Sequence, residues 1–105
     1  MEFSMAILND WQTGGSASAN LNGANLSNAV LTHANLSGAR LEDVNLSNSN
    51  LSDADLSNSN LTNANLSSSV LRGANLEFAN LQDTNFQNAD TTGVKLSNFS
   101  PSSYP

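Results

Sequence analysis

An apolar residue, almost always leucine, recurs at every fifth position through most of this chain. From Leu21 to Leu96 the repeat occupies sixteen consecutive positions, of which fifteen are apolar and one, Thr91, is polar. A step of five residues rotates an α-helix by about 140°, so these side chains would be spread around a helix and not form one face. In a straight strand an odd step sends successive side chains to opposite faces. The remaining solution is a backbone that turns by a constant angle every five residues, with each leucine pointing at the axis of the coil.

The residues around each leucine also follow a pattern, in which the leucine is here called position i. Position i−2 is small throughout, with alanine in ten of the sixteen units, which suits a second inward position near a corner. Position i−1 is Asn in ten units and Asp in two, and these side chains hydrogen-bond nearby main chain and tolerate unusual dihedral angles. Four glycines occupy position i+2, where they would ease a bend that needs positive φ.

The repeated motif A-(N/D)-L-x-x, seen as ANLNG, ANLSN, ANLSG and ADLSN, resembles that of pentapeptide-repeat proteins and extends over residues 19–98. The resemblance implies an all-β fold, a right-handed quadrilateral β-helix with four pentapeptides per coil and positions i and i−2 inside. Sixteen units would then make about four coils. Disorder, which a Ser/Asn-rich composition otherwise favours, is a poor alternative because leucines in phase serve no purpose in a random coil.

The N-terminal residues 1–18 depart from the repeat and are expected to cap the first coil, where strand edges and apolar side chains would otherwise be open. Phe3, Ile7 and Trp11 recur at helical spacing, which predicts a short helix from about residue 3 to 11 within this cap. The segment has neither a basic leading stretch nor a long apolar stretch, so it reads as neither a secretory signal nor a membrane span. We therefore expect a cytoplasmic protein that does not enter membranes.

The C-terminal residues 99–105 also leave the repeat. Phe99 and Tyr104 are expected to cover the last coil. The alternative is that they supply half of an end-to-end contact between two copies. The sequence leaves open whether the chain is a monomer or an end-to-end homodimer.

Charge and composition exclude several functions. The formal net charge is −6, with Arg40, Arg72 and Lys95 as the only cations apart from the single histidine, which disfavours direct binding of nucleic acid through phosphates. The chain has no cysteine, so no disulfide and no thiolate metal site can form. Charged residues make up 11% of the chain, well below the usual share of about 25%. Solubility must come from neutral Asn, Ser and Thr.

No constellation of residues indicates catalysis, a metal site or a cofactor. The single histidine, His33, would stack over Asp53 if the coil has four sides. An exposed pair of this kind on a convex wall is far more often a weak solvated contact than half of an active site. The neighbouring carboxylates of Glu42 and Asp43 lack further ligands of the kind that a calcium loop supplies. We therefore predict no enzyme, no cofactor and no catalytic or metal-binding residue.

The leading functional prediction is a structural or protein-interaction module with an unknown protein partner. Its evidence is that Val30, Val70 and Phe78 occupy outward positions, and exposed apolar or aromatic side chains can mark contacts. Scattered apolar residues on a surface are also normal, so these three are candidates only.

Two alternatives remain open. The first is DNA mimicry, because some members of the family are implicated in protecting or inhibiting type II topoisomerases by imitating an acidic duplex; here, however, the carboxylates are few and scattered for the charge density of DNA. The second is the ordering of ice or glycan on an uncharged wall with Asn25, Asn45, Asn65 and Asn85 in one column. Asn at i−1 belongs to the fold itself, which explains most of that wall.

Overall fold

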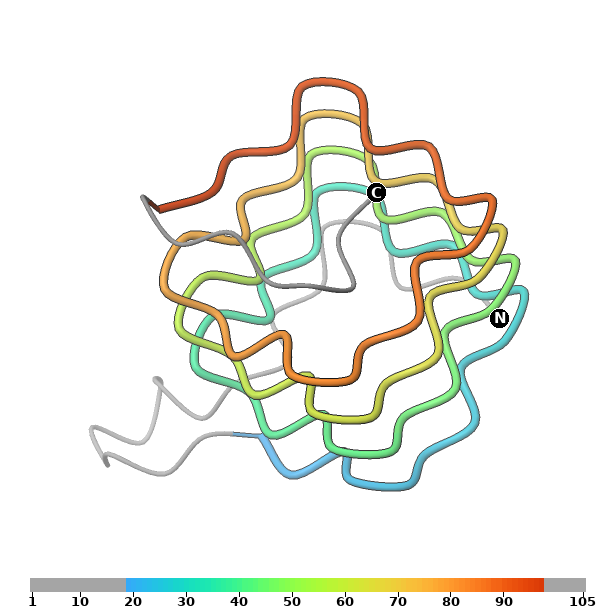
Figure 1. The fold of residues 1–105 in the computed structure, drawn as a ribbon, viewed down its shortest axis with the longest axis vertical. Helices are drawn as coiled ribbons and strands as arrows, with labels where there is room; N and C mark the ends of the chain where they lie inside the picture. The colour runs from blue at the N-terminus through green and yellow to red at the C-terminus, as the bar shows by residue number, and fades with distance from the viewer. Residues whose placement is uncertain (1–18, 98–105) are drawn as a thin grey trace.

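The structure is a computed structural model that describes residues 19–97. The chain winds in stacked laps of nearly the same outline around one axis (Figure 1). The predicted cap at 1–18 with its helix from 3 to 11, and the predicted capping by residues 99–105, lie outside the described residues.

Isolated parallel bridges join each lap to the next. There are twelve of them, all between residues at position i−1 and all twenty positions apart, from Asn20 with Arg40 to Asn75 with Lys95. A spacing of twenty residues confirms four pentapeptides per coil, because a three-sided coil would pair residues fifteen apart. Within the described residues, turns separate these bridges and no helix is long and apolar enough to cross a membrane.

Backbone hydrogen bonds between laps follow the same register. In the coil around Asn45, the Leu26 N–H donates to the Asn45 carbonyl (2.7 Å) and the Asn45 N–H donates to the Ala24 carbonyl (2.9 Å). A further bond connects the turns, where the Asn28 N–H donates to the Ser47 carbonyl at 3.0 Å. Each lap is thus held to its neighbours at its walls and at its corners, which satisfies main-chain groups that a curved backbone cannot pair within one lap.

The core confirms that positions i and i−2 point inward. Leu46, Leu51 and Leu56 have no exposed surface, and the alanines of the middle coils are buried beside them. Toward the two ends of the described solenoid the same positions, such as Leu21 and Leu96, are half-buried. Burying one leucine fully contributes about 2 kcal/mol, so the inward leucines are the main apolar source of stability.

Where a hydroxyl residue replaces alanine at i−2, the structure supplies an acceptor. Ser49 is buried, and its hydroxyl donates to the carbonyl of Leu46 at 2.6 Å. Ser59 and Ser69 repeat this contact, whereas the Thr84 hydroxyl donates to the Leu61 carbonyl of the preceding lap. These inward hydroxyls are hydrogen-bonded and therefore avoid the cost of a buried unpaired polar group.

Every corner is a tight turn with a left-handed residue. The N–H of the residue three positions after each leucine donates back to its carbonyl, as from Ala24 to Leu21 at 3.0 Å. All fifteen residues at position i+2 from 23 to 93 have positive φ, between 57° and 73°. Because the preceding residue keeps negative φ, each corner is a type II turn. The four glycines predicted to ease the bend are thus part of a requirement shared by all fifteen corners that the structure describes.

Candidate interaction surface

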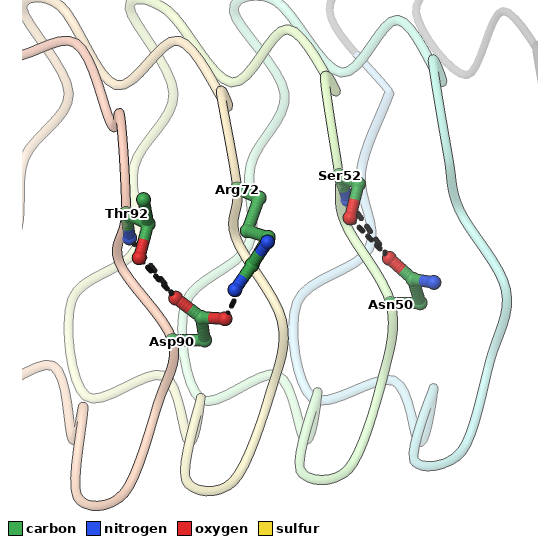
Figure 2. A network of polar contacts seen from close by, with 5 residues as sticks. All are labelled: Asn50, Ser52, Arg72, Asp90 and Thr92. Carbon is green, nitrogen blue, oxygen red and sulfur yellow. Dashed lines mark hydrogen bonds and ion pairs between the residues drawn. The ribbon is translucent and has the colours of Figure 1, made fainter.

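The polar residues at position i−1 have a structural role, because their side chains hydrogen-bond the main chain of their own turns. All twelve Asn and Asp side chains at this position accept a hydrogen bond through Oδ1 from the N–H of residue i+1. Figure 2 shows two of these caps, from Ser52 to Asn50 and from Thr92 to Asp90. We call this contact the Asx cap. It satisfies an N–H that neither the turn nor the next lap pairs.

One wall carries only neutral side chains. It consists of residues 24–28, 44–48, 64–68 and 84–88, and we call it the neutral wall. The oxygens of its asparagines at position i−1 form Asx caps. The hydroxyls of Ser27 and Ser47 also donate to two of these oxygens at 2.7 Å. Much of the hydrogen-bonding capacity of this wall is therefore used inside the turns.

The next wall departs most from the repeat. It consists of residues 29–33, 49–53, 69–73 and 89–93, and we call it the valine wall. Val30 and Val70 replace Asn in one of its columns, where Asn50 is bridged to both of them. Both valines are half-buried. Neither valine can form an Asx cap, whereas Asn50 and Asp90 in the same column do.

Two charged contacts lie on the valine wall. The Arg72 Nε lies 2.7 Å from the Asp90 Oδ2, and the Asp90 Oδ1 accepts hydrogen bonds from the Thr92 N–H and hydroxyl (Figure 2). The hydrogen bond from the Arg72 side chain, followed by those from Thr92, lowers the pKa of Asp90 to about 2. Asp90 in turn raises the pKa of Arg72. Both oxygens of Asp90 are thus committed within the wall.

The predicted stacking of His33 over Asp53 is confirmed. His33 Nε2 lies 3.8 Å from Asp53 Oδ2, and both side chains are more than half exposed. The other oxygen of Asp53 lies against Gly73, where an added Cβ would clash with it. Among residues 19–97, no group of three or more His, Asp or Glu side chains gathers closely enough to hold a metal ion.

Carboxylates occur on three of the four walls. The described part of the chain contains seven of them. Glu42, Asp43 and Asp83 lie on the first wall, which consists of residues 19–23, 39–43, 59–63 and 79–83. Asp53 and Asp90 lie on the valine wall, and Asp55 and Glu77 lie on the fourth wall, which consists of residues 34–38, 54–58, 74–78 and 94–97. Within residues 19–97, no wall carries a continuous acidic column.

Phe78 is the one large apolar side chain that the described residues leave exposed, with 71% of its surface open. It occupies position i+2, where its φ is 61°, and the twenty-residue register places it in a column with Gly38 and Asn58 at the end of the fourth wall. Val30 and Val70 lie in another column on the valine wall. The structure therefore brings the two valines onto one wall and keeps Phe78 apart from them.

The comparison with protein families places the chain in one family. The profile of the family described as Pentapeptide repeats matches residues 17–48, 49–88 and 59–98, with eight copies. The chain belongs to the pentapeptide-repeat family. Its members fold as right-handed quadrilateral β-helices, with which the twenty-residue lap agrees.

Solved structures of the same family superpose well on the chain. The pentapeptide repeat protein alr5209 of Nostoc Pcc 7120 is 35% identical, with a TM-score of 0.78 over 94% of this chain and 77% of its own. A pentapeptide repeat protein from the thylakoid lumen of Arabidopsis thaliana is 30% identical, with a TM-score of 0.77 over 89% of this chain and 59% of its own. HetL of Nostoc sp. strain PCC 7120, involved in heterocyst differentiation regulation, is 31% identical, with a TM-score of 0.65 over 94% and 48%.

The chain therefore spans 59% of the Arabidopsis protein and 48% of HetL. A search among curated proteins found no match.

Proposed function

We propose that this chain is a non-enzymatic protein-interaction module and that Phe78 is one of its contact residues. The observation that carries the proposal is an exposed aromatic side chain on a residue with left-handed backbone. Phe78 is 71% exposed and has a φ of 61°. Its column neighbours, Gly38 and Asn58, are residue types that adopt this conformation readily.

The fold does not require phenylalanine here. A left-handed conformation costs an ordinary L-residue roughly 1–2 kcal/mol, and a bulky residue is a rare occupant of it. Because most of the side chain is in solvent, burial within the solenoid offsets only part of that cost. Strained residues concentrate at functional sites, and aromatic side chains are enriched among the residues that dominate interfaces.

The rest of the described surface supports a scaffold and not a catalyst. Most outward Asn, Asp and Ser residues are engaged in Asx caps, and the contact between His33 and Asp53 is long and exposed. General acid–base chemistry needs a positioned base against a reacting group in a site that restricts water. The proposal includes a protein partner and a cytoplasmic location. It does not include binding to a membrane or direct binding to nucleic acid.

Site-specific photo-crosslinking tests this proposal. Benzoylphenylalanine replaces Phe78 in one protein and Asn88 in a control protein, because Asn88 has the same turn position with a φ of 62° on the neutral wall. Each protein is irradiated in lysate of the source organism, and adducts are identified by mass spectrometry. Competition uses an excess of unlabelled wild-type protein or of the Phe78→Asn variant.

We expect a discrete adduct from position 78 that wild-type protein competes away and the Phe78→Asn variant does not. Adducts shared by positions 78 and 88, or equal competition by both unlabelled proteins, would show that Phe78 marks no specific contact.

A further inference from the structure

A backbone donor on the valine wall lacks the acceptor that its equivalents have. The N–H of Arg72 is at position i+1, where an Asx cap would come from residue 70, but residue 70 is valine. In the part of the chain that the structure describes, no protein atom accepts a hydrogen bond from this N–H. An unpaired N–H costs free energy unless a solvent or partner oxygen reaches it.

A second unit without Asn or Asp at i−1 shows how the fold can compensate. Arg40 occupies that position, and the N–H of Glu42 donates instead to Asn22 Oδ1 of the preceding lap at 2.8 Å. For Arg72 the equivalent residue of the preceding lap is Ser52. Its hydroxyl donates to Asn50 Oδ1 at 2.7 Å. Within the described residues the Arg72 N–H makes no hydrogen bond to this hydroxyl, so the replacement used at Glu42 is not made at Arg72.

The neighbouring laps show which group fits the empty cap position. Arg72 lies between the capped turns of Asn50 and Asp90 (Figure 2), and in the first of these an amide oxygen receives the Ser52 N–H at 3.0 Å. Valine has no Oδ atom, so the corresponding oxygen must come from outside. The half-buried Val70 provides an apolar contact beside it.

Local charge decides between a neutral oxygen and a carboxylate. The Asp90 carboxylate is held 2.7 Å from Arg72 Nε, which compensates the charge of the guanidinium. A second carboxylate would meet this neighbour and an overall charge of −6, and like charges at close range repel. An uncharged amide carbonyl avoids that cost.

We propose that Val70 and the Arg72 N–H form a docking point for an amide carbonyl oxygen of a partner polypeptide, which completes the missing Asx cap from outside. The oxygen belongs to the partner's main chain, and an aliphatic side chain next to it packs on Val70. This point lies on a different wall from Phe78 and does not depend on the role proposed for that residue.

Amide NMR with a small-molecule probe tests the docking point directly. ¹⁵N-labelled protein is titrated with N-methylacetamide, which carries the amide oxygen alone, and separately with acetate at equal concentration and ionic strength. The readout is the ¹H shift of the Arg72 amide relative to the capped Ser52 amide. The variant Val70→Asn restores an internal cap, and the Ser52 resonance reports whether that variant remains folded.

N-methylacetamide is expected to move the Arg72 amide proton downfield by at least three times the shift of Ser52, and Val70→Asn is expected to abolish the difference. The Phe78→Asn variant should respond as the wild type, which separates this inference from the proposed function. Equal shifts for Arg72 and Ser52, or an unchanged response in Val70→Asn, would overturn the docking point. A larger shift with acetate would overturn the assignment to a neutral carbonyl.

Discussion

The Asx cap can be added and removed within one column of the valine wall. Asn50→Val removes both bonds that Asn50 Oδ1 accepts, from the Ser52 N–H at 3.0 Å and from the Ser52 hydroxyl at 2.7 Å. Val70→Asn makes the reverse change one lap further along, where the Arg72 N–H lacks a cap. The two substitutions should therefore change the free energy of unfolding with opposite signs.

The magnitude follows from the number and exposure of the bonds. A net contribution of about 0.5–1.5 kcal/mol per hydrogen bond gives about 1–3 kcal/mol for two. The wall is half-buried, so water replaces part of the loss, and valine fits a pleated surface better than asparagine. We expect Asn50→Val to lower the free energy of unfolding by about 1 kcal/mol, and Val70→Asn to raise it by a similar or smaller amount.

Urea denaturation followed by circular dichroism measures both effects. With an unchanged slope, the midpoint reports stability alone, and 1 kcal/mol corresponds to roughly 4–8 °C in Tm for a domain of this size. Asn50→Asp is the matched control, because Asp55 and Asp90 form the same cap. If Asn50→Val and Asn50→Asp had equal effects, or if Val70→Asn destabilised the protein, the cap would not contribute as argued.

Three further predictions concern the core, the exposed aromatic residue and the loss of stability at low pH. Leu51→Ala should lower the free energy of unfolding by about 3 kcal/mol. Leu21 is half-buried, so Leu21→Ala should lower it by only about 1 kcal/mol. Equal losses in urea denaturation would contradict a core centred in the middle laps. Phe78→Asn should leave this free energy within about 0.5 kcal/mol of wild type or raise it, because relief of strain opposes the lost contacts; a loss above about 2 kcal/mol would show that Phe78 is a core residue. Because the pKa of Asp90 falls to about 2 from its ordinary 3.8, the carboxylate contributes stability that is complete above the ordinary value and lost as pH falls through about 2. Arg72→Ala should move the pKa of Asp90 upward in an NMR titration, and an unchanged pKa would refute the contact.

The period of five was sufficient to predict which residues form the core. Leucine in phase excludes a helix and a straight strand, and the burial of Leu46, Leu51 and Leu56 confirms the inward assignment. The number of walls was not determined by the period, because a constant turn every five residues is compatible with three sides or four. Family resemblance supplied the choice, and the bridges twenty residues apart confirm it.

The functional residues of the surface were harder to predict, because identifying them depends on backbone angles and on individual hydrogen bonds. Glycine at i+2 indicated positive φ in four units, but only the backbone shows that Phe78 shares this requirement. Likewise, Val70 could be recognised from the sequence as an outward apolar residue. That its consequence is an uncapped Arg72 N–H follows only from knowing which oxygen caps which turn.

Pairs of cysteines test the geometry of the lap most directly, because the chain has no cysteine of its own. Adjacent laps lie about 4.8 Å apart, within the Cα separation of about 4.4–6.8 Å that a disulfide spans. The pair Ser47→Cys and Ser67→Cys is twenty residues apart, and the pair Ser47→Cys and Thr62→Cys is fifteen apart. Four-sided laps predict rapid disulfide formation under mild oxidation in the first pair only. Faster or equal formation in the second pair would contradict the quadrilateral coil.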